Sequence, residues 1–63
     1  MTLANVIATI PAIDTINVQD SNGSLYEGSN QNLRATYENV NDILDKEVTL
    51  LRPFRDVLII GIE

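Results

Sequence analysis

The sequence contains no cysteine and no histidine. Without cysteine the chain cannot form a disulfide, and a zinc site would lack both of its usual ligand types. Histidine and cysteine also supply most catalytic bases and nucleophiles, so the common forms of acid–base and covalent catalysis are missing. We therefore expect a protein that is not an enzyme and that binds no metal and no cofactor.

Basic residues are scarce. Four Lys and Arg stand against nine Asp and Glu, which gives a net charge of −5, and none of the four precedes Arg34. A protein that binds nucleic acid needs several cations facing the phosphates, so we expect no direct nucleic-acid binding. An acidic surface keeps a small protein soluble, and it would also suit a partner protein with a basic surface.

Long hydrophobic runs are absent as well. No apolar stretch is long enough to cross a bilayer, so we expect no membrane association. The apolar start of the chain has no basic residue before it and is interrupted at Pro11, unlike a secretory signal, and we expect a cytoplasmic protein. The 63 residues predict a single domain, 1–63, near the lower size limit for independent folding. A core this small would gain stability from self-association, for example as a homodimer.

The most informative segment that is present is the last one, residues 56–63. Its aliphatic residues occupy both alternating sets of positions, including the adjacent pair Ile59 and Ile60. A strand with apolar side chains on both faces must be covered on both faces. The segment is therefore predicted to be a central strand, with Ile59 and Ile60 both buried.

A first short helix is predicted near the start of the chain. Thr2 can serve as its N-cap, and Pro11 disfavours helical geometry at the residue before it, so the helix should end near Thr9 or Ile10. An apolar stripe at spacing i, i+3, i+4, i+7 would dock this helix on one face of the strand predicted over residues 56–63. The stripe consists of Leu3, Val6, Ile7 and Ile10.

A second amphipathic helix is predicted over about residues 31–43, with Ser29, Asn30 and Asn32 as candidate N-caps. A break near Asn39 is the alternative, because Asn and Asp side chains compete for backbone hydrogen bonds. Its apolar stripe consists of Leu33, Tyr37, Val40 and Leu44.

Alternating apolar and polar residues predict three further strands, at residues 13–20, 24–28 and 46–52. The first two form a hairpin. The third places Val48 and Leu50 on one side and ends at Pro53. The short turn that follows makes it an antiparallel hairpin with the last strand. The predicted fold is an α+β domain of order α-β-β-α-β-β, with two short helices and an antiparallel four-stranded sheet in the order 2-1-4-3.

The first hairpin turns around the Asn-Gly pair at residues 22–23, and two registers are compatible with it. A two-residue turn at this pair would place Val18 opposite Glu27. A type I turn that starts at Asp20, with the glycine in a left-handed bulge position, would place Val18 opposite Tyr26. We favour this second register because it suits the turn residues and pairs an aromatic with a β-branched side chain.

Five residues are candidates for binding a partner. Glu38, Asp42 and Asp45 follow the spacing i, i+4, i+7, which makes an acidic stripe on a continuous helix. Phe54 and Arg55 lie in the turn before the last strand, and an exposed aromatic beside arginine is typical of interaction anchors. A solvated helix face and a ring folded over the core are the alternatives. A carboxylate catalytic or metal site is the weakest interpretation, because one stripe encloses no substrate.

The chain also carries a core-and-turn pattern of three segments. They read Ile16-x-Val18-x-Asp20-x-Asn22-Gly23-x-Leu25-Tyr26-Glu27-Gly28, Ile43-Leu44-Asp45-x-Glu47-Val48 and Asp56-Val57-Leu58-Ile59-Ile60. This pattern resembles short, uncharacterised proteins encoded in phages and prophages of Gram-positive bacteria. The resemblance covers most of the chain, but it includes no active-site signature, so it implies a context and not a mechanism.

These features predict a small acidic, non-enzymatic protein-interaction module, acting as a phage-encoded inhibitor or adaptor on a host or phage protein. Small acidic phage proteins that inhibit DNA-acting enzymes, such as uracil-DNA glycosylase, illustrate this mode of action by analogy. The alternative is a structural homo-oligomer with no separate ligand.

Overall fold

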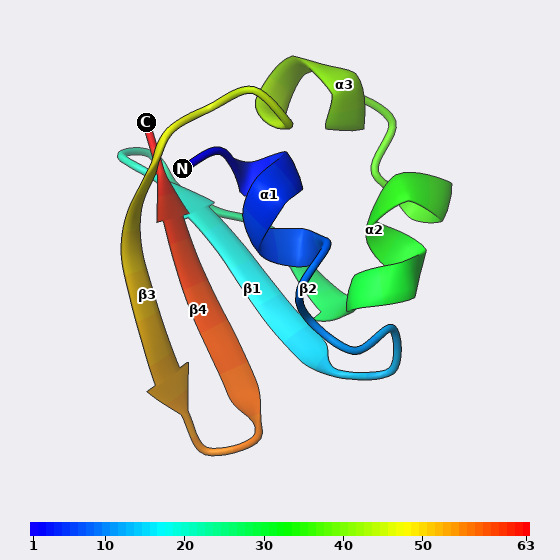
Figure 1. Ribbon diagram of the computed structural model, residues 1–63. Coiled ribbons are helices and arrows are strands. Elements are labelled where there is room, and N and C mark those ends of the chain that lie inside the picture. Colours follow the sequence, from blue (N-terminus) through cyan, green and yellow to red (C-terminus); the bar gives the residue numbers. More distant parts are fainter.

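The computed structural model describes residues 1–63 as three short helices and one four-stranded sheet. In chain order the elements are α1 (Leu3–Ile7), β1 (Thr15–Asp20), β2 (Gly23–Ser29), α2 (Asn30–Thr36), α3 (Val40–Ile43), β3 (Val48–Phe54) and β4 (Val57–Ile62). The α+β class predicted from the sequence is confirmed, with three helices in place of two (Figure 1).

The strand order is β2-β1-β4-β3, so the predicted order is confirmed and β4 lies inside the sheet. The predicted antiparallel sheet is wrong at one pair. The outer pairs β1–β2 and β3–β4 are antiparallel, but β1 and β4 are parallel, and the sheet is therefore mixed.

The connection between the two hairpins explains the parallel pair. In Figure 1, α2 and α3 carry the chain from the lower end of β2 to the upper end of the sheet. β3 therefore starts at the top and runs downward, and β4 returns upward beside β1 in the same direction. An antiparallel sheet of this order would need a connection that stays at the lower end.

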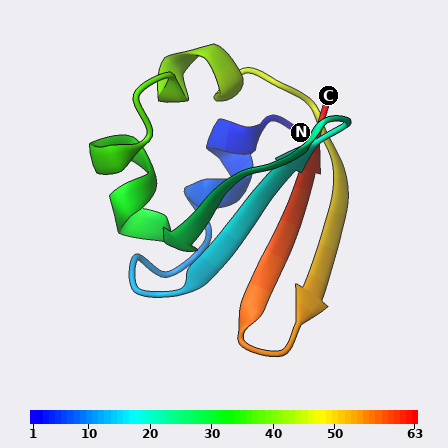
Figure 2. The same cartoon turned by 180° about the vertical axis from the view of Figure 1, so that it is seen from behind.

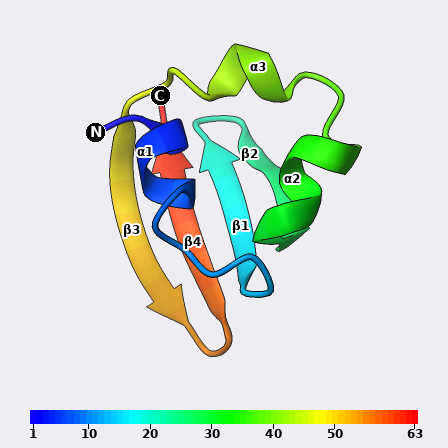
Figure 3. The ribbon, with the colours of Figure 1, turned by 45° about the vertical axis from the view of Figure 1, so that its right-hand side comes forward.

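The helices pack on one face of the sheet, with α1 lying over β4 (Figure 3). The apolar side chains between the two layers form one cluster, to which both central strands and all three helices contribute. Its members are Leu3, Val6, Ile7, Ile16, Val18, Leu33, Val40, Ile43, Ile60 and Ile62. The predicted docking of the first helix on the last strand is confirmed, because Leu3 and Ile60 are fully buried in the same cluster.

α1 begins at the predicted cap. The hydroxyl of Thr2 accepts a hydrogen bond from the Asn5 backbone N–H at 3.3 Å, and the Asn5 side-chain oxygen accepts one from the Thr2 N–H at 3.2 Å. This reciprocal capping box satisfies two donors at the helix start. The helix ends at Ile7, before the predicted end at Thr9 or Ile10.

A side chain of α2 holds the turn that follows α1. The amide nitrogen of Asn30 donates to the carbonyl oxygens of Ile7 and Ile10, both at 2.9 Å. These bonds satisfy carbonyl groups that a helix end leaves without intrahelical partners. Among the predicted N-caps, Ser29 occupies the cap position without a side-chain hydrogen bond, and Asn30 links α2 to α1 instead.

The second predicted helix, over residues 31–43, is two helices. Residues 37–39 separate α2 from α3, so the predicted break near Asn39 is confirmed. Tyr37 takes an extended conformation with φ −86° and ψ 109°, which ends α2. Glu38 lies in the separating segment, and the continuous helical stripe predicted for the acidic residues therefore does not form.

The first hairpin adopts the favoured register, in which Val18 pairs with Tyr26. The side chain of Asp20 accepts a hydrogen bond from the backbone N–H of Asn22 at 2.8 Å, which is typical of Asp at the start of a turn. Gly23 has a φ of 126°, a conformation that L side chains rarely adopt. The turn residues therefore determine the register, as the sequence indicated.

β3 differs from the strand predicted over residues 46–52. The pairing with β4 shifts between Val48 and Leu50, so Val48 packs against the core while Leu50 pairs with Gly61 on the other face. The alternation of the sequence had placed Val48 and Leu50 on the same side. Pro53 lies within the strand and does not end it, which is compatible with the edge position of β3.

Candidate functional site: the uncovered face of the sheet

No helix covers the second face of the sheet, and Figure 2 shows β3 and β4 without a helix in front of them. Side chains directly opposite each other on neighbouring strands point to the same face, so the pairing register identifies three rows across it. The rows are Phe54–Val57–Thr15–Ser29, Arg52–Ile59–Asn17–Glu27 and Leu50–Gly61–Gln19–Ser24. We call these residues the outer face.

The β3 and β4 half of the outer face is apolar. Phe54 is 56% exposed and Leu50 is 45% exposed, while Val57 and Ile59 are half-buried. β4 thus carries apolar side chains on both faces, but the chain shields only the face with Ile60. The prediction that both faces are covered is therefore wrong for the single chain, and apolar surface remains at the centre of the sheet.

The β1 and β2 half of the outer face is polar. The side chain of Asn17 is buried there, and its amide nitrogen donates to Ser24 Oγ at 3.1 Å and to Glu27 Oε1 at 2.9 Å. Its carboxamide oxygen is buried without a hydrogen-bond partner. Leaving a buried acceptor unpaired costs about 1–3 kcal/mol.

Two of the few basic residues of the chain lie on or beside the outer face. Arg52 stands in the central row, and Arg55 lines a shallow groove of about 240 Å³ together with Phe54, Ile59 and Glu27. These two arginines are half of the four basic residues in the sequence, whereas Glu27 is the single acid of the three rows. The apolar face is therefore locally basic although the protein is acidic.

Arg55 occupies a backbone conformation that disfavours its residue type. Its φ is 57°, in the left-handed region, at the first residue of the two-residue turn between β3 and β4. Its guanidinium carbon lies 5.4 Å from the centroid of the Phe54 ring, within cation–π range. Strained residues cluster at functional sites, so the pair formed by Arg55 and Phe54 is a candidate contact of this face.

We predict that Arg55→Gly is more stable than Arg55→Ala by about 1 kcal/mol. Both variants lose the guanidinium contact with Phe54, and only glycine relieves the strain of the positive φ. Urea denaturation of the two proteins measures the difference. Equal midpoints and slopes would show that position 55 is not strained.

The structure separates the predicted partner-binding residues into two surfaces. Glu38, Asp42 and Asp45 are exposed around α3, whereas Phe54 and Arg55 lie at the β3–β4 turn. Figures 1 and 3 place α3 at the top of the molecule and that turn at the bottom. No group of three acidic side chains that could hold a metal ion is formed.

Sequence reasoning missed the central row of the outer face. Arg52, Asn17 and Glu27 come from three separate strands and meet only through the strand pairing around Ile59. The alternation within each strand predicts which residues share a face, but the direction of the β1–β4 pairing is needed to put them in one row.

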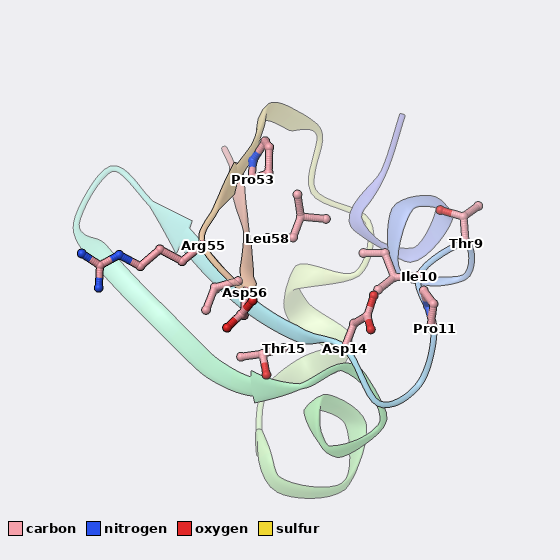
Figure 4. A pocket seen from close by; sticks show the side chains of 10 residues that line it. Thr9, Ile10, Pro11, Asp14, Thr15, Pro53, Arg55, Asp56 and Leu58 are labelled. Atoms are coloured by element: carbon pink, nitrogen blue, oxygen red, sulfur yellow. The ribbon is translucent and has the colours of Figure 1, made fainter.

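A larger cavity of about 450 Å³ lies where β1 and β4 begin, between the α1–β1 loop and the β3–β4 turn (Figure 4). Its carboxylates, Asp14 and Asp56, belong to exposed residues and have no third acidic neighbour. Figure 4 shows Arg55 extending away from Ile10 and Asp14, toward the outer face. The cavity therefore lacks the enclosed polar groups that fix a small ligand.

Comparison with known proteins does not assign this site. No protein-family model matches the chain, and no curated protein or solved structure matches it either. The resemblance to phage and prophage proteins therefore stays a prediction. None of the helices is long and apolar enough to span a membrane.

Proposed function

We propose that the protein is a small, non-enzymatic interaction module that binds a protein partner through the outer face of its sheet. The observation that carries this proposal is the composition of β4, which is apolar on both faces, combined with a helical layer that shields only one of them. Burying the remaining apolar side chains against a partner is favourable at about 25 cal/mol per Å².

Three features support the proposal that the outer face binds a partner and is not simply a surface exposed to solvent. Phe54 and the arginines are residue types enriched at interface centres. Arg55 keeps a strained turn conformation that glycine would adopt freely. Asn17 keeps a buried acceptor that the chain leaves unpaired. The strained turn and the unpaired acceptor each cost stability in the free protein, and their presence on this face therefore supports a role in binding.

The outer face suits a partner of different chemistry from the one that the sequence suggested. The sequence suggested an acidic surface for a basic partner, through Glu38, Asp42 and Asp45. The apolar surface instead carries Arg52 and Arg55, so its complement combines apolar and acidic groups. In the phage context that the sequence suggests, the partner would be a host or phage protein.

Capture of partners with the immobilised protein tests which surface is used. A Phe54→Ser/Ile59→Thr variant removes apolar groups from the outer face without touching the buried cluster. A Glu38→Gln/Asp42→Asn/Asp45→Asn variant removes the charges around α3. We expect partners captured from a Gram-positive lysate to be reduced about tenfold or more by the first variant and little by the second.

The salt dependence separates the two surfaces further. Binding through an apolar face with two arginines should weaken only partly as salt rises, whereas binding through exposed carboxylates is strongly screened. Capture that survives the outer-face substitutions and disappears with the carboxylate substitutions would contradict the proposal. Each variant is first compared with the unmodified protein by urea denaturation, so that loss of folding is recognised.

A further inference from the structure

We propose that the occupant of the outer face is a second copy of this chain, packed face to face about a two-fold axis that runs parallel to the strands between β1 and β4. This inference rests on the proposed function, and it assigns the outer face to a second copy in place of a different host or phage protein. The observation behind it is the order of charges along the central row, which has a cation at one end and a carboxylate at the other. Two such rows that run in opposite directions place each cation opposite a carboxylate.

The central row reads Arg52, Ile59, Asn17, Glu27 across the sheet from β3 to β2. Its basic end lies on one edge strand and its acidic end on the other. A two-fold axis along the middle of the sheet places β3 of one copy over β2 of the other. Arg52 of each copy then faces Glu27 of its partner, and the two ion pairs form in symmetric positions.

The same row argues against the other face-to-face arrangement. An axis perpendicular to the strands and centred on this row would place β3 over β3, so the two Arg52 side chains would oppose each other. Juxtaposed like charges disfavour an interface. The parallel axis also keeps the strand directions of the two sheets close to each other, which is the usual geometry of aligned sheet packing.

In the parallel arrangement the apolar half of each outer face lies on the polar half of the other. Phe54 faces the row position of Ser29, whose hydroxyl oxygen is buried and unpaired in the single chain. A reversible interface of this kind need not be more apolar than an average protein surface. A standard interface of about 800 Å² per copy would cover about a fifth of the 4158 Å² that the chain exposes.

Charge reversal tests both the second copy and its orientation. The probe is the purified chain itself, followed by sedimentation equilibrium up to about 1 mM, where interactions of about 4 kcal/mol are still detected. The average mass of the unmodified chain is expected to rise from 7.0 kDa toward twice that value. Arg52→Glu and Glu27→Arg, measured separately, are each expected to raise the dissociation constant about tenfold or more.

Mixing the two variants provides the decisive measurement. In a mixed pair the introduced carboxylate at position 52 faces the introduced guanidinium at position 27, and the native Arg52 faces the native Glu27. Association of the mixture is therefore expected to return toward that of the unmodified chain, which a misfolded variant could not produce. The exposed positions of both residues leave the buried cluster intact.

Three results would overturn the inference. A chain that stays at 7.0 kDa at every concentration has no second copy on this face. If Arg52→Glu strengthens the dimer, the two copies have a different orientation. The same conclusion follows if mixing the two variants does not restore association. The chain could be monomeric while the Phe54→Ser/Ile59→Thr variant captures less of a lysate protein than the unmodified chain does. In that case the proposed function stands, and the outer face binds that other protein.

Discussion

Replacing Ile60 by alanine is expected to remove about half of the stability of the protein. Ile60 is fully buried at the centre of the sheet, beneath α1, in the cluster that both layers share. Removing a buried isoleucine to alanine costs about 2–5 kcal/mol, because transfer free energy is lost and a cavity remains. A domain of 63 residues has only about 3–9 kcal/mol of total stability at about 0.05–0.15 kcal/mol per residue.

Ile59 provides the matched control for this prediction. It is the same residue type in the same strand, but it points to the outer face and is only half-buried. Ile59→Ala is expected to cost about 1 kcal/mol or less, although the sequence alone predicted both residues to be equally buried. Urea denaturation of the two variants at low protein concentration measures the contrast. Equal losses would mean that the two faces of β4 are shielded alike.

Replacing Leu33 by alanine is expected to loosen α2 from the sheet. Leu33 is the only buried residue of α2, and it is fully buried. Helices of this length are not stable alone in water, so α2 depends on its contacts with the rest of the chain. Leu33 supplies the only buried apolar side chain among these contacts, and Asn30 supplies two hydrogen bonds to the end of α1 and the turn that follows it. We expect a loss of about 2–5 kcal/mol, with the largest acceleration of amide hydrogen exchange in α2, residues 30–36.

The neighbouring Arg34→Ala serves as the control for helix propensity, since Arg34 is exposed. It should change the stability by no more than about 0.5 kcal/mol. Exchange that accelerates evenly over the whole chain in Leu33→Ala would show that α2 and the sheet unfold as one unit. Exchange that does not change in residues 30–36 would contradict the anchoring role of Leu33.

Local sequence rules were sufficient for several features of the fold. The cap at Thr2 and the turn at Gly23 follow from hydrogen-bonding and φ preferences that act within a few residues. The central position of β4 follows from its unbroken apolar composition, because only an inner strand tolerates it. The break between α2 and α3 occurs near Asn39, as the alternative to one continuous helix predicted, although the weak helix formers Asn41 and Asp42 are helical in α3.

Other features depend on parts of the chain that are far apart in sequence. The direction of β4 relative to β1 is set by how far α2 and α3 carry the chain along the sheet, which no local pattern encodes. The shift between Val48 and Leu50 reverses the faces predicted from alternation. The row that joins Arg52 to Glu27 depends on the direction of β4 and on this shift. The sequence therefore predicted Phe54 and Arg55 but not the central row.

The parallel contact between β1 and β4 has a consequence for synthesis. β4 is the last of the four strands to be translated, yet it occupies the middle of the sheet. Until it leaves the ribosome, the β1–β2 hairpin has an open inner edge and α1 has no strand beneath it. The nascent chain therefore cannot fold step by step, and it stays accessible to chaperones and proteases until β4 has emerged.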